Sequence, residues 1–417
     1  MKDSGIEWIG EIPDEWLISK IGQLYHERNV KVSDLEYPPL SVTMRGIVPQ
    51  LATAAKSDAH DQRKLVCKGD FAINSRSDRR GSCGISEHTG SVSLINTILV
   101  PYGDMNPHYY NWLFHTVQFA DEFYKWGHGI VDDLWTTHWK DMKNISIPVP
   151  TLLEQQIISS FLDKKCAEID SIIEKTRESI EEYKKLKQAV ITEAVTKGVR
   201  GKREMKDSGV EWIGDIPKEW KPIKYKYVAK IVRGGSPRPA GSPVYYYGEI
   251  PFMKVADITK DDKMYVNSCE GSIKEAGLSN TRMVKSGTLL LTNSGATLGV
   301  PKITTINTTI NDGIAAFIIV DKKVDNKFLY YSLKCKTKYF LEIASLGMGQ
   351  PNLNTEIIGN TFFVLPTLDE QKTILEYLDV KCSEINAIIS KKEALLEELE
   401  TYKKSLIYEY VTGKKRL

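Results

Sequence analysis

The sequence predicts an α+β protein with two mixed α/β globules separated by two long antiparallel helices that form a coiled coil, arranged as a pseudo-two-fold internal repeat. Three observations support this prediction. A motif of sixteen residues occurs twice, a second pair of segments aligns without gaps, and the stretches between them have similar lengths but little similarity. With 417 residues, of which 41% are apolar, the chain is long enough to bury two ordinary cores.

The repeated motif opens each half of the chain. MKDSGIEWIGEIPDEW at 1–16 returns as MKDSGVEWIGDIPKEW at 205–220, with 13 of 16 positions identical. Chance does not produce such identity, so the chain is one unit written twice. We interpret the tryptophans of the motif as packing the base of each globule against the helices, with contact to a partner as the alternative. They are Trp8, Trp16, Trp212 and Trp220.

The second pair of segments predicts the helices. Residues 150–196 align with 366–412 at 22 of 47 identical positions, and both have apolar residues at helical spacing with no Gly or Pro after the first residue. Each segment predicts a continuous helix of about 45 residues, or roughly 65 to 70 Å at about 1.5 Å per residue. Such a length exceeds that of ordinary globular helices and favours a coiled coil.

Local signals mark where these helices begin and end. Thr151 with Glu154, and Thr367 with Glu370, have the spacing of a capping box. Glycines follow each helix at the position where a left-handed residue commonly ends one, and they are Gly198 and Gly413. The predicted limits are 1–150 for the first globule, 151–200 for the first helix, 201–365 for the second globule and 366–417 for the second helix.

Composition argues against several classes of protein. The six cysteines include no Cys-x-x-Cys pair, and the seven histidines lie in the first half without a paired spacing, so we expect no metal site. A duplicated enzyme would duplicate its catalytic residues, so we expect no catalytic site. The chain has no run of about 18 apolar residues, and its start lacks the pattern of a signal peptide. We therefore expect a cytoplasmic protein with no membrane partner.

Two short motifs are weak signals for an enzyme. Gly295-Ala-Thr-Leu-Gly299 lacks the Lys-Ser/Thr of a phosphate-binding loop. Asn106-Pro107-His108-Tyr109 is similar to the tetrapeptide with which amino-methyltransferases hold a flipped base, but it lacks the second proline and no cofactor-binding glycine loop precedes it. We interpret it as a turn that starts a helix.

Basic residues gather at the start of the second globule. Segment 221–254 has seven basic residues and one acidic residue, a net charge of 7 − 1 = +6, although the whole chain carries only +2. Tyrosines are interleaved with them, and the small residues of Gly234-Gly235-Ser236-Pro237 would let the backbone approach a phosphate. This pattern predicts a polyanion-binding surface. A solvated basic face without a partner is the alternative.

Polar groups suited to DNA also occur in the first globule. Basic residues flank Gly69-Asp70, and Asn74-Ser75-Arg76 combines the amide, hydroxyl and guanidinium groups that recognise base edges. Both globules have glycine-containing turns late in their sequences, and the second turn carries Gln and Asn. The candidate DNA-binding residues are Lys64, Lys68, Asn74, Ser75, Arg76, Arg79 and Arg80 in the first globule, and Arg233, Ser236, Arg238, Lys254, Asn293, Ser294, Gln350, Asn352 and Asn354 in the second. Surface loops without a partner are the alternative.

This combination resembles the specificity subunit of Type I restriction-modification systems over essentially the full chain. The resemblance is carried by KDSGxEWIGxIPxEW in both halves, PTLxEQ at the start of each long helix, VTKG or VTGK at its end, and GSPRP at 235–239 with GQPNLN at 349–354. The first globule departs from the last motif, because it has Gly129-Ile-Val-Asp-Asp-Leu134 instead. Function is therefore not carried over onto that loop.

The resemblance implies a non-catalytic DNA-binding subunit. Its two target-recognition domains would each bind one half of a split sequence in double-stranded DNA, and the helices would set the spacing. Two methyltransferase subunits would dock on the helices and methylate adenine N6 with S-adenosylmethionine, and two restriction subunits that use ATP and Mg can join them. No cofactor is expected in this chain.

Two other classes of protein compete with this interpretation. One is a duplicated coiled-coil scaffold whose globules bind proteins and not DNA. The other is a self-sufficient methyltransferase or nuclease. Binding of duplex DNA argues against the first, and binding of a cofactor by the isolated chain would favour the second.

Overall fold

The computed structural model describes residues 1–50, 60–129, 135–295, 297–345 and 352–417. The chain divides into two compact units. Unit 1 consists of residues 1–178 and 393–417, and unit 2 consists of residues 179–392. Each unit combines one globule with a part of both long helices, and the class is α+β as predicted.

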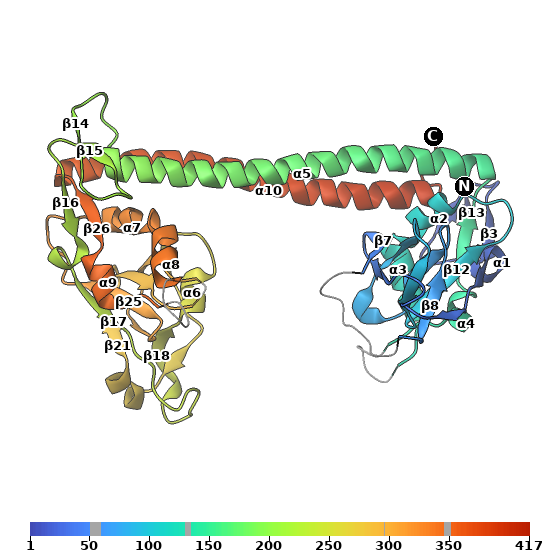
Figure 1. Cartoon of the computed structure of the whole chain (residues 1–417), viewed down its shortest axis with the longest axis horizontal. Helices are drawn as coiled ribbons and strands as arrows, with labels where there is room; N and C mark the ends of the chain where they lie inside the picture. Colours follow the sequence, from blue (N-terminus) through green and yellow to red (C-terminus); the bar gives the residue numbers. More distant parts are fainter. Residues whose placement is uncertain (51–59, 130–134, 296, 346–351) are drawn as a thin grey trace. The chain divides into compact units, whose positions relative to one another are not determined.

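Two long helices are the main helical elements of the chain (Figure 1). Helix α5 spans Leu152–Lys197 and helix α10 spans Leu368–Val411, with 46 and 44 residues. Both lengths confirm the prediction. Gly198 and Gly413 follow the helix ends with φ of 78° and 70°, in the left-handed region where glycine ends a helix without steric cost.

The two long helices pack as an antiparallel pair. In unit 1, the Phe161 and Tyr410 rings lie 4.6 Å apart, and the Lys403 ammonium lies 2.6 Å from the Asp170 carboxylate. The residue number on α10 falls as the number on α5 rises, which only an antiparallel pair produces. The buried residues of the predicted seam are Ile158, Leu162, Ile169, Ile173, Ile180, Ile374, Leu378, Ile385 and Leu406.

The globule of unit 1 is built on a four-stranded sheet of order β10-β9-β12-β4 and a three-stranded sheet of order β11-β8-β5. Their strands are β4 (Tyr25–Glu27), β5 (Lys31–Val32), β8 (Arg63–Val66), β9 (Phe71–Asn74), β10 (Cys83–Ile85), β11 (Gly90–Ser93) and β12 (Asn96–Pro101). The ladders are β1 (Lys2–Asp3) with β2 (Glu11–Ile12), β3 (Leu17–Lys20) with β13 (Ser146–Val149), and β6 (Leu40–Thr43) with β7 (Gly46–Pro49). The helices are α1 (Ile21–Leu24), α2 (Pro107–Phe114), α3 (Val117–Lys125) and α4 (Trp139–Met142), with a 3-10 turn at Ser77–Arg79.

The globule of unit 2 has a five-stranded sheet of order β17-β25-β22-β23-β19 and a four-stranded sheet of order β20-β18-β24-β21. Their strands are β17 (Lys230–Arg233), β18 (Tyr246–Met253), β19 (Tyr265–Val266), β20 (Ser272–Ile273), β21 (Arg282–Val284), β22 (Leu289–Thr292), β23 (Pro301–Thr304), β24 (Thr308–Ile310) and β25 (Ile314–Ile318). The ladders are β14 (Met205–Asp207) with β15 (Asp215–Pro217), and β16 (Lys221–Lys224) with β26 (Phe362–Leu365). The helices are α6 (Val255–Thr259), α7 (Asn326–Lys334), α8 (Thr337–Ser345) and α9 (Thr355–Asn360), with 3-10 turns at Tyr225–Tyr227 and Glu275–Asn280.

The repeated motif joins each globule to the start of a long helix. The indole nitrogen of Trp16 donates to Glu154 at 3.0 Å, and that of Trp220 donates to Glu370 at 2.7 Å. Both tryptophans are buried, so their interpretation as packing residues is confirmed. Partial burial alone would raise the pKa of Glu154, but hydrogen bonds from Trp16 and Thr151 hold it below its ordinary value.

The glutamine of PTLxEQ fixes a second point of each globule. Gln155 accepts a hydrogen bond from the Asn106 backbone at 2.9 Å, and Gln371 accepts one from the Asp325 backbone at 2.8 Å. Asn106 and Asp325 are the N-caps of α2 and α7, and each accepts from the backbone two residues later. The predicted helix-starting turn at Asn106 is therefore confirmed.

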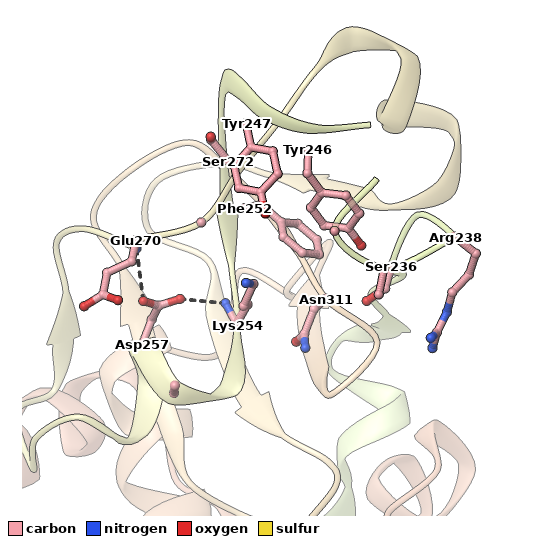
Figure 2. Close-up of a pocket in the computed structure, with 14 residues that line it drawn as sticks. Ser236, Arg238, Tyr246, Tyr247, Phe252, Lys254, Asp257, Glu270, Ser272 and Asn311 are labelled. Carbon is pink, nitrogen blue, oxygen red and sulfur yellow. Dashed lines mark hydrogen bonds between the residues drawn. The ribbon is translucent and has the colours of Figure 1, made fainter. Parts of the chain in front are cut away.

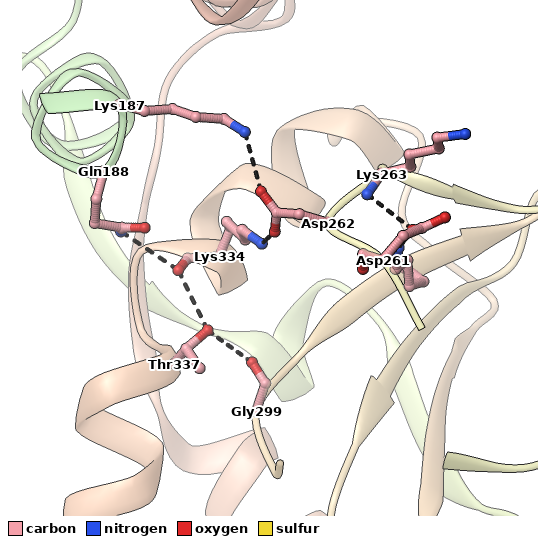
Figure 3. Close-up of polar contacts among 9 residues, drawn as sticks. Lys187, Gln188, Asp261, Asp262, Lys263, Gly299, Lys334 and Thr337 are labelled. Atoms are coloured by element: carbon pink, nitrogen blue, oxygen red, sulfur yellow. Dashed lines mark hydrogen bonds and ion pairs between the residues drawn. The ribbon is translucent and has the colours of Figure 1, made fainter. Parts of the chain in front are cut away.

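Helix α5 is also held by charged groups within unit 2 (Figure 3). The Lys187 ammonium lies 3.0 Å from the Asp262 carboxylate, which also pairs with Lys334 at the end of α7. Burial alone would raise the pKa of Asp262, but the two lysines hold it below its ordinary value. The carboxylate thus stays ionised and links the helix to the globule.

Candidate nucleic-acid interface

In unit 2, the end of strand β22 meets the late loop of the globule. Ser294 and Asn352 form an isolated antiparallel bridge, and the Leu353 backbone nitrogen donates to the Asn293 carbonyl at 2.8 Å. Three predicted residues from distant parts of the sequence, Asn293, Ser294 and Asn352, are therefore neighbours in the fold.

The other predicted residues of the late loop have different positions. Gln350 lies outside the described residues. Asn352 and Asn354 are both exposed. Asn354 is the N-cap of α9, and its side chain accepts from the Ile357 backbone at 2.7 Å. Of the predicted residues of this loop that the structure describes, the exposed Asn352 is thus the one placed to meet a ligand without giving up a cap.

The same arrangement occurs in unit 1. Arg76 and Thr136 form an isolated antiparallel bridge, and the Thr137 backbone nitrogen donates to the Ser75 carbonyl at 3.0 Å. The end of strand β9 therefore meets residues 135–137, as the end of β22 meets residues 352–353. Both joins are made by the main chain.

Three predicted side chains are buried at these strand ends. Asn74, Ser75 and Asn293 are 7%, 3% and 0% exposed. The Asn74 side chain accepts from the Arg76 backbone at 3.1 Å, and the Ser75 hydroxyl lies 3.0 Å from that of Thr97. Because these side chains are buried, base contact from them would require a local rearrangement.

Two hollows in unit 1 collect most of the predicted residues. One of about 570 Å³ is lined by Asn74, Arg79 and Arg80, together with the buried Arg63. The other, of about 580 Å³, is lined by Lys64, Ser75 and Arg76. Lys68 is not among the lining residues, and its ammonium lies 3.8 Å from Glu87 on the exposed surface.

The cations around these hollows already have acidic neighbours. Arg80 pairs with Asp121, the Arg79 guanidinium lies 3.7 Å from Asp78, and both arginines are well exposed. Exposed ion pairs of this kind contribute only about 0 to 1 kcal/mol. A DNA phosphate can therefore compete for these cations at little cost.

In unit 2, three predicted residues converge on one carboxylic acid residue that the sequence analysis did not select. Arg233 donates to the Asp312 carbonyl at 2.7 Å, the Ser236 hydroxyl donates to its carboxylate at 2.6 Å, and the Arg238 guanidinium lies 3.6 Å from that carboxylate. Asp312 thus organises the basic segment. An acidic residue in a tight Asn-Asp-Gly turn is the signal that could have found it.

The glycines of the basic segment have a different role from the one predicted. A Cβ on Gly234 would lie 2.2 Å from the Asn311 carbonyl oxygen, and one on Gly235 would lie 2.3 Å from the Asn280 carbonyl oxygen. Their small size lets the backbone approach neighbouring protein backbone. The prediction that they make room for a phosphate is replaced by this packing reason.

A hollow of about 500 Å³ lies beside this segment (Figure 2). Its lining includes the predicted residues Ser236, Arg238 and Lys254. The Tyr246 hydroxyl, whose pKa is raised by burial, stays protonated and donates to the Pro237 carbonyl at 2.7 Å. Cationic, hydroxyl and aromatic groups therefore surround one space, as expected for a site that binds part of a nucleic acid.

Two further findings concern other classes of function. Within the described residues, no group of three or more His, Cys, Asp or Glu side chains is placed to hold a metal ion. Among the same residues, no helix combines the length and the apolar character needed to cross a bilayer.

Comparison with known proteins gives the family. The family described as "Type I restriction modification DNA specificity domain" matches residues 217–398. The Type I restriction enzyme MjaVIII specificity subunit of Methanocaldococcus jannaschii is 25% identical, and the match covers 97% of this chain and 94% of the relative. The MjaIX specificity subunit of the same organism is 31% identical over 40% of this chain and 39% of its own length.

Solved structures share the fold. A chain in a structure described as "Structural basis underlying complex assembly and conformational transition of the type I R-M system" has a TM-score of 0.75 at 16% identity, covering 97% of this chain and 100% of that one. The HsdS subunit from Thermoanaerobacter tengcongensis has a TM-score of 0.55 at 17% identity, covering 97% and 98%.

The matching family is described by its DNA specificity, and cation-lined hollows occur in both globules. Residues 217–398 belong to the Type I restriction modification DNA specificity domain family, and the chain is similar over 97% of its length to a Type I specificity subunit. It recognises target DNA for the enzyme and is itself non-catalytic.

Proposed function

We propose that each of the two domains, 1–150 and 201–365, recognises one half of a bipartite DNA sequence. The observation that supports this best is the repeated join of a strand end to a late loop, Arg76 to Thr136 and Ser294 to Asn352, in globules whose hollows are lined by different side chains. One frame with two sets of polar groups suits a target whose halves differ. Arginine, lysine and amide groups of this kind contact phosphates and base edges.

The candidate contacts in this proposal are the predicted residues. Exposed cations such as Arg79, Arg238 and Lys254 would meet phosphates, and Asn352 would meet a base edge. Gln350 and Asn354 belong to the same loop in the sequence. The buried Ser75 and Asn293 would act through their backbone carbonyls, which accept hydrogen bonds from the late loops, and Asn74 through its bond from the Arg76 backbone.

The long helices at 151–200 and 366–417 would set the spacing and dock two methyltransferase subunits. Exposed apolar side chains occur at matching positions of the repeat, Ile172 with Ile388 and Leu186 with Tyr402, between 36% and 52% exposed. Equivalent apolar positions on two copies of one helix would suit two copies of one partner. In this proposal the partners carry S-adenosylmethionine and methylate adenine, restriction subunits with ATP and Mg join them, and the complex works on DNA in the cytoplasm.

Methylation mapping tests the proposal. Cells that express this chain with its methyltransferase subunits should carry N6-methyladenine in one bipartite sequence, detected by sequencing that reports modified bases. Cells with the methyltransferase subunits alone serve as the control and should lack that pattern. Methylation in a continuous, undivided sequence would contradict recognition by two separate domains.

A further inference from the structure

Tyr247 is an exposed aromatic residue in a strained backbone conformation. Its φ is 64° and its side chain is 75% exposed. Such a φ is uncommon for a residue other than glycine and costs on the order of 1 to 3 kcal/mol. The pairing of β18 with β20 shifts register between Tyr246 and Ile250, so the strand has a bulge at this point. Bulges beside functional sites commonly re-aim a side chain.

The neighbours of Tyr247 hold the bulge in place. The Tyr246 ring packs edge-on against Phe252, with centroids 5.9 Å apart, and its hydroxyl donates to Pro237. A Cβ on Gly248 would lie 2.3 Å from the Ile273 carbonyl oxygen, so a larger residue does not fit there. With both neighbours fixed inward, Tyr247 is the side chain directed to solvent.

The surroundings of Tyr247 are those of a nucleotide site. It lies on the lining of the 500 Å³ hollow together with Arg238, Lys254 and Asn311 (Figure 2). An exposed ring and two cations on the lining of one hollow provide a stacking surface and phosphate contacts.

We propose that Tyr247 stacks on one base of the DNA half-site bound by the second domain, and that the adjoining hollow receives that nucleotide. Arg238 and Lys254 contact the flanking phosphates. Stacking on a base of duplex DNA needs an opened base step, which an inserted side chain can stabilise. This inference rests on the proposed function and adds an aromatic contact to it.

Binding of the mapped duplex by the full chain with its methyltransferase subunits tests this inference. Loss of one base-stacking contact lowers affinity by roughly 5- to 150-fold. We expect Tyr247→Ala to weaken binding within this range, and Tyr247→Phe to stay within about twofold because the ring and not the hydroxyl stacks. Tyr265→Ala is the matched control, since Tyr265 is 39% exposed in the same unit but lies outside segment 221–254 and does not line this hollow.

Abasic substitutions in the second half-site locate the contact. At one position, removal of the base should weaken binding by the wild-type complex and have little further effect on the Tyr247→Ala complex, as for two groups that touch each other. Binding by Tyr247→Ala within twofold of wild type, or equal losses at every abasic position, would overturn the inference. A wild-type complex that does not prefer the mapped duplex over a scrambled one would instead contradict the proposed function.

Discussion

The two globules use the same main-chain join to hold different side chains. In unit 1 the end of β9 pairs with residue 136, and in unit 2 the end of β22 pairs with residue 352. Main-chain hydrogen bonds use the backbone N–H and C=O groups. Every residue has both except proline, which lacks the N–H, so these bonds survive changes of side chain. The frame can therefore be kept while the chemistry at its surface diverges.

The surface chemistry does differ at one comparable connection. The turn that enters β12 exposes Leu94 and Ile95, at 39% and 40%, whereas the turn that enters β25 contains Asp312 held by Arg233 and Ser236. An apolar tip suits contact with a thymine methyl group, and an ion-paired tip suits polar groups. A duplicated frame is therefore compatible with an asymmetric target.

Lengthening the helices should have the largest effect on the DNA target. It should change the spacer between the half-sites and leave the recognition surfaces of both globules unchanged. Inserting four residues after both Glu182 and Glu398 adds about 6 Å at about 1.5 Å per residue, or close to two base pairs at about 3.4 Å each. We expect methylation mapping to report a longer spacer with both half-sites unchanged. A target with the original spacer would show that the helices do not set the distance.

A buried lysine distinguishes unit 2 from unit 1. Thr116 precedes α3 and caps it by accepting from Phe119 at 3.2 Å, whereas the corresponding residue before α8 is Lys336. Lys336 is 1% exposed, with its ammonium 4.6 Å from the centre of the Trp212 ring. Burial lowers its pKa to about 8 from the ordinary value of 10.5.

The sign of the resulting pH dependence follows from linkage. Between pH 8 and 10.5 the unfolded chain binds the Lys336 proton and the folded chain does not, so stability rises with pH by at most about 1.4 kcal/mol per pH unit. Below pH 8 both states are protonated and this contribution is constant. We expect Lys336→Met to flatten the rise, measured by urea unfolding at pH 8.0 and 9.5.

The control for this prediction is a lysine two residues later, in the first turn of α8. Lys338 has a side chain that is 91% exposed, so Lys338→Met should retain the rise of stability with pH. If Lys336→Met keeps the same slope as wild type, another group causes the dependence.

Replacing Asn352 should change the second half-site of the DNA target and leave the first half-site unchanged. A good bidentate contact to a base contributes about 1 to 3 kcal/mol of discrimination. We therefore expect Asn352→Ala to relax the second half-site, with the first half-site as the internal standard in the same methylation map. Asn354→Asp is a companion variant, because aspartate preserves the cap of α9. Uniformly weaker methylation with unaltered preference would mean that Asn352 only positions the DNA.

The smallest expected difference concerns the two helix starts. The Thr151 backbone donates to Glu154 at 3.0 Å and Thr151 accepts from the Glu154 backbone at 3.3 Å, which completes a capping box. In the second copy, Glu370 is held by Trp220 and by Arg203, 2.6 Å away. Thr151→Ala should cost about 1 kcal/mol and Thr367→Ala less, measured as shifts of the urea midpoint. Equal costs would show that both starts depend on the threonine.

Part of the candidate site could be predicted from residue types alone. The basic segment and Asn352 could be predicted, because charge and turn composition are local properties of the sequence. Asp312 could not be predicted, since an acidic residue counts against a polyanion site until its bonds to Arg233 and Ser236 are known. Tyr247 was not selected either, because its exposure comes from a bulge set by pairing with β20.

The sequence by itself determined the duplication, the class, the two long helices and their ends. These features depend on periodicity, capping and glycine conformation, which involve residues within a few positions of one another. The tertiary structure alone decided that Asn74 and Asn293 are buried, that Ser294 meets Asn352, and that Tyr247 faces solvent. Burial and strand pairing depend on contacts between segments far apart in the chain, and no local pattern encodes them.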